Sequence, residues 1–177
     1  DYWLKGIDNG IMDEEPIHYW TIDAKKGEEW RATWTWPLAD ETRRVLYFAA
    51  GRMGTSNSIN DGLLTYKRPA TDAYDYYTAD YSTTSGLTNR WGNANGGATG
   101  YLDLSENDGK GLTFTTKPLE ADVEITGHPV VHLWVSVNQS DCAFYVYLED
   151  IHPNGNSQYV TEGDMLGSHR KLSDACL

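Results

Sequence analysis

The sequence predicts an all-β domain with the architecture of a β-sandwich, and two observations carry that prediction. Every second residue from Val131 to Val137 is apolar, and the same holds from Phe144 to Leu148. A period of two is typical of strands that bury one face in a core. Turn signals recur roughly every 8–12 residues, which is typical of a sandwich or a barrel, and the Asn-Gly pair at 154–155 is a strong tight-turn signal.

The N-terminal half is expected to hold the end of a helix and several short extended segments. Residues 1–7 carry apolar side chains in the spacing of a last helical turn, and Asn9-Gly10 is the expected stop. Beyond it, runs of β-branched and aromatic residues bounded by turn residues predict extended segments. They lie at 17–22, 29–37, 45–50 and 63–66.

The C-terminal half begins with a predicted loop. Residues 71–100 are rich in Tyr, Thr, Asn, Gly and Asp, a composition typical of a long excursion from a β-sheet. The apolar runs that follow predict further strands at 112–116, 123–126, 130–137, 144–151 and 158–161. Residues 167–177 match neither a strand nor a helix.

The alternating strands leave aromatic side chains on the face opposite the core. Trp134, Tyr145 and Tyr147 lie on that face. Exposed to water they would form an apolar patch, which usually marks an interaction surface. Three alternatives remain for what covers this aromatic face: the loop at 71–100, a partner domain, or a ligand that stacks on the rings.

Composition excludes two classes of partner. The 177 residues carry 14 basic and 26 acidic side chains, for a net charge of -12. This charge repels phosphate backbones and anionic lipid surfaces, so neither nucleic acid nor a membrane is expected to bind. The longest strongly apolar run, 130–137, is far shorter than the roughly 20 residues of a membrane helix. Compartment stays open.

Neither a cofactor nor a metal is predicted. Cys142 and Cys176 lack metal-ligand spacing and do not form a disulfide framework, and we expect Cys142 to be a small core or rim residue. His128 and His132 would lie about 13 Å apart on a strand, too far to share one ion. The polar segment 103–109 has its glycine one position late for a calcium loop, so a polar turn is expected there.

The chain also lacks the sequence pattern of a serine hydrolase nucleophile. That chemistry on an α/β scaffold needs a G-x-S-x-G turn that presents the hydroxyl at a strand end, and no such pattern occurs. We therefore predict no catalytic residue. The chain starts without Met and inside a patterned segment, so we expect it to be an excised piece of a longer polypeptide.

Motifs along the whole chain, in order, resemble one known domain. The opening is DYWLKGIDNGIMDEEPIHYWTI, followed by EEWRATWTWPL, RRVLYFAAG and TNRWG. The central strands read KGLTFTTKPLEADVEITGHPVVHLWVS and AFYVYLEDIHPNGNSQYVTEG, and GSHRKLSD follows them. This series resembles the C-terminal β-sandwich of the cocaine-esterase and X-Pro dipeptidyl-peptidase group of serine hydrolases. One departure is Ala143, where many relatives place an Asp.

The resemblance implies a jelly-roll, galactose-binding-like sandwich over residues 13–177, incomplete at its C-terminal edge. Residues 1–12 would be the end of a preceding hydrolase-domain helix and a linker. The catalytic Ser, Asp and His of such enzymes lie upstream on an α/β-hydrolase domain of the same polypeptide. The expected function is that of a non-catalytic domain, which braces the catalytic domain of an esterase or dipeptidyl-peptidase and helps to wall its active-site cleft.

Two other functions stay open. A free-standing carbohydrate-binding module would use exposed indole rings for sugar stacking, although a sandwich fold alone is weak support for it. The stacking candidates are Trp34, Trp36, Trp91 and Trp134. A homo-oligomer would instead bury the face that carries Trp134, Tyr145 and Tyr147.

Overall fold

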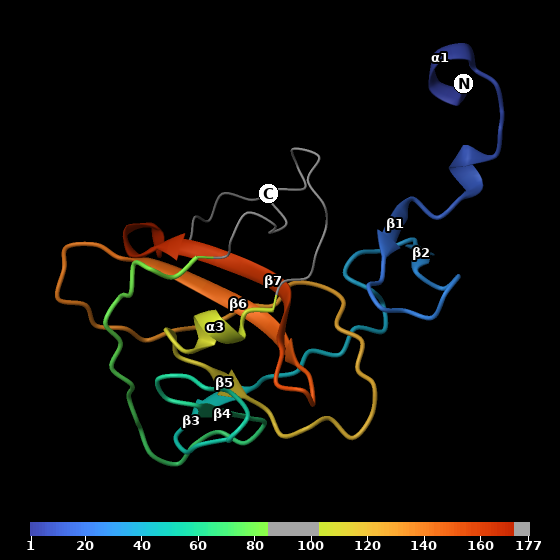
Figure 1. Cartoon of the computed structure of the whole chain (residues 1–177). Helices are drawn as coiled ribbons and strands as arrows, with labels where there is room; N and C mark the ends of the chain where they lie inside the picture. Colours follow the sequence, from blue (N-terminus) through green and yellow to red (C-terminus); the bar gives the residue numbers. More distant parts are fainter. Residues whose placement is uncertain (85–102, 172–177) are drawn as a thin grey trace. The chain divides into compact units, whose positions relative to one another are not determined.

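Strands dominate the regular structure of the chain, and helices are few and short (Figure 1). The computed structural model describes residues 1–84 and 103–171. No helix in these two ranges has the length and apolar character that a membrane span requires. The all-β prediction is confirmed, whereas the jelly-roll arrangement stays a prediction.

The chain forms two compact units. The first unit contains residues 1–44 and 121–130, and the second contains residues 45–120 and 131–177. Each unit therefore draws on two separate stretches of sequence. The expected domain boundary after residue 12 stays a prediction.

The first unit begins with a single helical turn, α1 (Tyr2–Lys5), followed by a 3-10 turn, η1 (Ile11–Asp13). The helix end predicted by residues 1–7 is present, but the stop expected at Asn9-Gly10 is wrong. The helix already ends at Gly6, which has φ 65° and donates its N–H to the carbonyl of Tyr2 at 2.9 Å. Glycine adopts this left-handed conformation without the penalty that a Cβ would bring, so the turn closes there.

Two antiparallel strands follow, β1 (Ile17–Trp20) and β2 (Trp30–Thr33). The tryptophans that end β1 and begin β2 are cross-strand partners, and their rings meet edge to face at 5.3 Å. Such aromatic pairs stabilise a two-stranded ribbon. Arg31 on β2 donates from Nη1 to both carboxylate oxygens of Glu124 at 2.7 Å, which joins the two sequence stretches of this unit.

The second unit contains a small mixed sheet of β3 (Tyr47–Ala49), β4 (Gly62–Thr65) and β5 (Phe114–Thr115). β4 lies in the middle, antiparallel to β3 and parallel to β5. The rings of Phe48 and Phe114 pack at 4.4 Å. Gly62 makes this approach possible, because a Cβ there would lie 2.5 Å from the Phe114 ring.

A long hairpin of β6 (Ala143–Ile151) and β7 (Ser157–Leu166) forms the other sheet of the second unit. The tight turn predicted between these strands is confirmed. His152 and Asn156 close it through a backbone hydrogen bond of 2.9 Å, and Gly155 has φ 90°. The pairing skips Val160 opposite Leu148 and Glu149, which places a bulge in β7.

The helical turn α3 (Ser105–Asp108) is linked to this hairpin. Asp103, just before the turn, forms an isolated bridge with Gln158 of β7, and the N–H of Leu104 donates to the carbonyl of Ser157 at 2.8 Å. Leu104 and Tyr159 are the buried apolar side chains of the described residues. The polar turn expected at 103–109 is therefore a short helix that covers part of the core.

Two predicted strands, at 123–126 and 130–137, are wrong. Neither segment forms a strand, and their apolar side chains are exposed, from 42% for Val131 to 93% for Trp134. Alternation shows what a strand could bury, but a strand also needs a partner for its backbone groups. Within residues 1–84 and 103–171, no further strand pairs with β6 or β7, so the predicted central strand has no strand partner there.

Candidate functional site

The interface residues predicted from the sequence fall in both units. Trp134 and Tyr145 belong to the second unit and are 93% and 67% exposed. Tyr147 is half-buried, and its ring lies 6.5 Å from the ring of Tyr159. On the face of β6 that was expected to point outward, Tyr145 is exposed and Tyr147 is partly packed against Tyr159.

Two of the remaining candidates belong to the first unit. Trp34 and Trp36 belong to the first unit, where Trp36 meets Tyr19 edge to face at 5.8 Å and His128 at 6.3 Å. Trp91 lies outside the described residues. The structure therefore brings Trp36 into an aromatic cluster, whereas Trp34 is 59% exposed.

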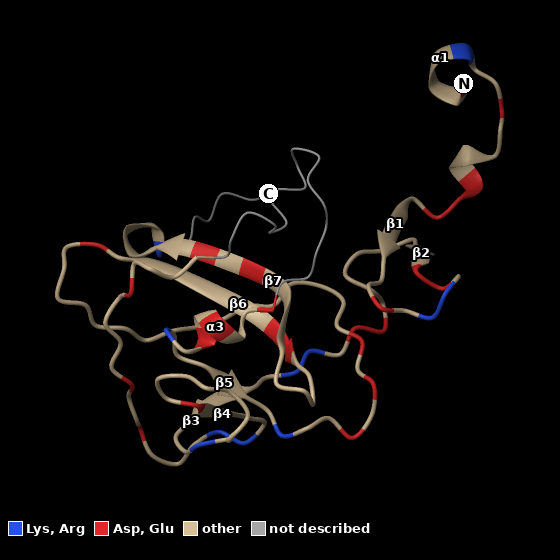
Figure 2. Cartoon of the chain, in the orientation of Figure 1, with Lys and Arg blue, Asp and Glu red and all other residues tan. Residues whose placement is uncertain are grey.

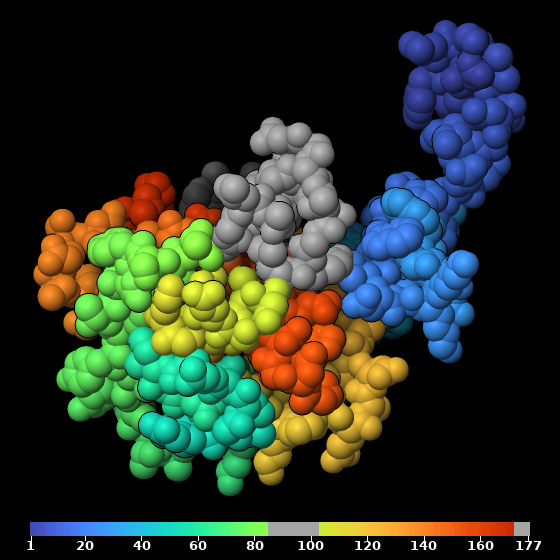
Figure 3. Space-filling model, viewed as in Figure 1, coloured from blue at the N-terminus to red at the C-terminus, as the bar shows by residue number. Residues whose placement is uncertain are grey.

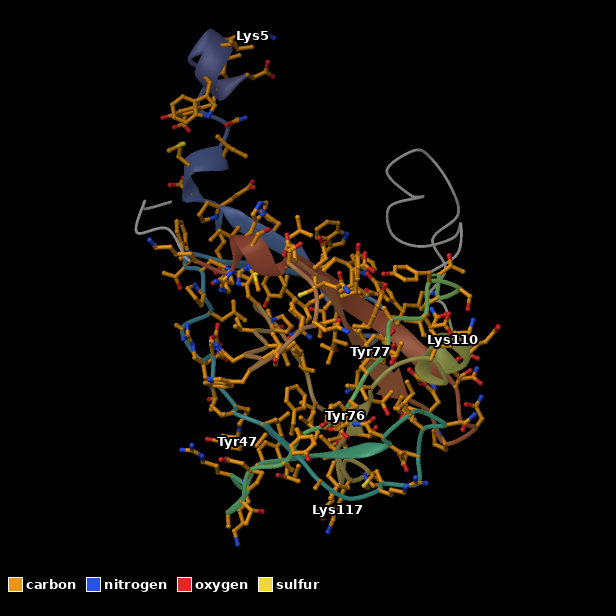
Figure 4. All side chains as sticks on the ribbon, turned by 90° about the vertical axis from the view of Figure 1, so that its left-hand side faces the viewer. Lys5, Tyr47, Tyr76, Tyr77, Lys110 and Lys117 are labelled. Carbon is orange, nitrogen blue, oxygen red and sulfur yellow. The ribbon has the colours of Figure 1, made fainter. Side chains whose placement is uncertain are left out.

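The described part of the predicted covering loop leaves the aromatic face open. Tyr74, Tyr76 and Tyr81 in this segment are themselves largely exposed. Figure 4 places Tyr76 and Tyr77 on the chain between β4 and α3. Because Tyr145 stays two-thirds exposed, residues 71–84 do not cover it.

A buried polar cluster, which sequence reasoning missed, centres on Asp108. This carboxyl is only 6% exposed, and its Oδ2 accepts hydrogen bonds from Ser56 Oγ at 3.1 Å and from Ser157 Oγ. Glu149 on β6 is near enough for the negative charge of Asp108 to contribute to raising its pKa. Three separate stretches of the second unit thus converge on one carboxylate.

Electrostatics in this cluster depend on burial and on neighbouring acids. Removal from water, followed by interaction with Asp108 and the charge of Asp103, raises the pKa of Glu149 to about 8. The pKa of Asp103 is lowered instead, because the backbone and hydroxyl of Ser105 and the N–H of Ser157 donate to it. Glu149 is therefore protonated at neutral pH, while Asp103 is ionised.

A second carboxylate ties the ends of the hairpin together. Asp141 accepts hydrogen bonds from Ser168 Oγ at 2.6 Å and from the N–H groups of Cys142 and Ser168 at 2.9 Å. The Ser168 hydroxyl and these N–H groups lower the pKa of Asp141. Ser168 lies in the 3-10 turn η2 (Gly167–His169), so this carboxylate joins the start of β6 to the turn after β7.

Two arrangements typical of hydrolase active sites are absent from the described residues. No group of three or more His, Cys, Asp or Glu side chains in residues 1–84 and 103–171 has metal-binding geometry. Within the same ranges no serine hydroxyl is hydrogen-bonded to a histidine, the pairing that activates a serine nucleophile. The serines of the buried cluster donate to a carboxylate, which holds them in place.

Comparison with known proteins gives a consistent result. The model of the X-Pro dipeptidyl-peptidase C-terminal non-catalytic domain matches residues 9–176. Proteins named as serine esterases in Mycobacterium tuberculosis and Mycobacterium bovis are each 37% identical over 177 residues, which covers 98% of this chain and 26% of the relative.

Cocaine esterase of Rhodococcus sp. is 29% identical over 139 residues, which covers 77% of this chain and 24% of that enzyme. No solved structure matches the chain significantly. The chain spans about a quarter of the length of the curated relatives it matches.

Proposed function

The chain belongs to the family of X-Pro dipeptidyl-peptidase C-terminal non-catalytic domains, which are β-sandwich domains, and we propose that it braces the catalytic domain of a larger serine hydrolase and helps to wall its active-site cleft. The substrate would be an ester, as the names of the relatives suggest, or an X-Pro peptide, as the family name suggests. The catalytic Ser, Asp and His would lie on the partner domain, in the part of the polypeptide that the matched relatives have in addition.

The exposed apolar segment 131–137 and the exposed ring of Tyr145 carry this proposal. Every second residue from Val131 to Val137 is apolar and exposed, and Trp134 between them is almost fully open to water. A water-soluble surface rarely keeps so many large apolar groups in one stretch unless a partner covers them. Aromatic residues also dominate the centres of protein interfaces, where truncation often costs more than about 2 kcal/mol.

The segment offers backbone as well as side chains to a partner. Residues 131–137 have strong β-propensity but form no strand, and no further strand pairs with β6 or β7 in the described part of the chain. An extended segment with unpaired N–H and C=O groups can pair with a strand of another domain. Docking would then bury both the rings and the backbone of one stretch.

Activity of the intact protein tests the proposal. We expect Trp134→Ala and Tyr145→Ala to lower the temperature of thermal inactivation and to raise KM for bulky esters, because a loosened wall leaves the cleft less well formed. Tyr66→Ala is the matched control, since Tyr66 is 65% exposed and Tyr145 is 67% exposed. Unchanged inactivation temperature and KM in both test variants would count against a docking role for this surface.

Carbohydrate binding is the second candidate function, and the exposed rings of the first unit favour it. Trp34 is 59% exposed, and Trp36, two residues further along the chain, forms an aromatic cluster with Tyr19 and His128. Aromatic rings beside polar groups suit stacking against a sugar face. Titration of intrinsic Trp fluorescence with oligosaccharides tests it: a saturable change that Trp34→Ala abolishes supports binding, and no change with any sugar excludes it.

A further inference from the structure

One face of the β6–β7 hairpin carries tyrosines and acids side by side. Residues directly opposite each other in an antiparallel pair project to the same face of the sheet. The register places Tyr145 opposite Asp164 and Tyr147 opposite Glu162. The Cβ atoms of such a pair lie about 5 Å apart, and successive pairs on one face are about 7 Å apart along the strand. Two phenol rings and two carboxyl groups therefore gather in one small patch, which we call the tyrosine–acid face.

The helical turn α3 covers the other end of this side of the hairpin. The N–H of Leu104 donates to the carbonyl of Ser157, where β7 begins, and in Figure 3 the yellow residues around α3 lie against the orange turn of the hairpin. Ser157 and Tyr159 are accordingly buried, at 1% and 7% exposure. Farther from the turn, Tyr145 is 67% exposed and Asp164 is exposed, so this end of the face is open to a partner.

The hairpin supplies no cation to the tyrosine–acid face. Figure 2 shows acidic residues and no Lys or Arg along β6 and β7, and the sequence has neither residue between Lys117 and Arg170. Arg170 follows the turn η2, and its Nη1 donates to the carbonyl of Gly167 at 2.9 Å. In residues 1–84 and 103–171, no ion pair involves Asp164. The charge of this carboxylate is thus left for a partner to compensate.

A tyrosine ring beside a carboxylate suits a guanidinium group. Arginine stacks its plane on aromatic rings and pairs with a carboxylate through two parallel hydrogen bonds. A purely apolar partner would instead bury the carboxylate without a compensating charge, which is costly. A second copy of this chain, with a net charge of -12, would add repulsion. The rest of the polypeptide is the better source of a basic surface, because the chain spans about a quarter of its curated relatives.

We propose that the catalytic domain of the same polypeptide meets the tyrosine–acid face with a basic surface, in which an arginine side chain packs on Tyr145 and pairs with Asp164. This inference rests on the proposed docking function and adds the chemistry of the partner surface. Segment 131–137 offers apolar contact, whereas the tyrosine–acid face offers charge. Complementary charges fix the orientation of two surfaces more than they raise affinity, so this face sets how the domains align.

Hydroxyl-radical footprinting of the intact protein, with Tyr145 as the reporter, tests the proposal. The test variant is Asp164→Lys, in which a longer neighbouring side chain can only shield Tyr145, so a faster reaction must come from lost docking. Asp150→Lys is the matched control, because Asp150 is an equally charged residue of the same hairpin, is 68% exposed and alternates to the opposite face of β6. Both proteins and the wild type are measured at about 0.01 M and about 1 M salt, which screen charges over about 30 Å and about 3 Å.

We expect strong protection of Tyr145 in the wild type at about 0.01 M salt. Its oxidation should rise at least about threefold in Asp164→Lys, and also in the wild type at about 1 M salt. Asp164→Asn removes the charge without adding one, so it should give a smaller rise, and Asp150→Lys should follow the wild type. Protection that neither Asp164→Lys nor salt reduces would overturn the basic partner and leave the docking itself intact. A wild-type Tyr145 without protection would refute the docking as well.

The same assay separates the catalytic domain from two other occupants. Protection of Tyr145 that is lost on about 100-fold dilution of the wild type would identify a second copy of the protein, because only association between molecules depends on concentration. Arg90, outside the described residues, is the one Lys or Arg in residues 69–109. Faster oxidation of Tyr145 in Arg90→Gln would show that the chain covers its own face. Either result would overturn the proposal, and unchanged protection in both supports it.

Discussion

The raised pKa of Glu149 predicts how the stability of the fold changes with pH. The folded chain keeps a proton on Glu149 up to about pH 8, whereas the unfolded chain loses it near its ordinary pKa of 4.5. The native state therefore binds the extra proton between these values, so stability falls as pH rises through this window. The contribution is fully present below pH 4.5 and absent above about pH 8.

The size of this stability change follows from the difference between the folded and unfolded pKa values of Glu149. Each pH unit contributes about 1.4 kcal/mol, which gives about 5 kcal/mol over the whole interval for a fully buried group. Glu149 is half-buried, and solvent screening reduces the expected change to about 2 kcal/mol. Glu149→Gln cannot ionise, so it should not lose this stability as pH rises.

Urea unfolding followed by circular dichroism measures the difference. Between about pH 5 and about pH 8.5 the wild-type free energy of unfolding should fall about 2 kcal/mol further than that of Glu149→Gln, at equal dependence on urea. Asp150→Asn provides the control on the same strand and should follow the wild type. Parallel pH profiles for wild type and Glu149→Gln, or a wild type that gains stability toward pH 8.5, would refute the reasoning.

Two further substitutions probe packing and the hairpin ends. Gly62→Ala should destabilise the second unit by about 1–3 kcal/mol, because the added Cβ would meet the ring of Phe114. Gly163→Ala serves as the control, because a Cβ at Gly163 would enter open space. Equal melting temperatures for the two variants would contradict the predicted clash. Asp141→Ala should speed trypsin cleavage after Arg170, because the substitution removes the hydrogen bonds that hold the turn after β7. Unchanged cleavage kinetics would show that other contacts hold this turn.

The sequence predicted those elements whose determinants are local. The hairpin of β6 and β7 follows from clean alternation on both sides of an Asn-Gly turn, and both features need only neighbouring residues. The segment 130–137 has the same alternation but forms no strand, because a strand depends on a distant partner that the local pattern does not contain. The apolar residues of this segment remain exposed, and this exposure makes the segment a candidate docking surface.

The buried carboxyl cluster could not be predicted in the same way. Asp108 and Ser157 are 49 residues apart, and their meeting depends on how α3 docks on the hairpin. Glu149 shared its predicted strand face with Tyr145 and Tyr147 and was expected to face outward. The register shift beside it and the approach of α3 bring it near the charge of Asp108 instead, and neither feature has a signature in the sequence.

The central claim is that residues 131–137 and Tyr145 dock against a catalytic domain of the same protein. Hydroxyl-radical footprinting of the intact native protein tests it directly, with each residue compared with its own rate in the unfolded chain. We expect strong protection of Trp134 and Tyr145, although they are 93% and 67% exposed in this chain, and little protection of Tyr66 at 65%. Labelling of Trp134 and Tyr145 as free as that of Tyr66 would contradict the claim.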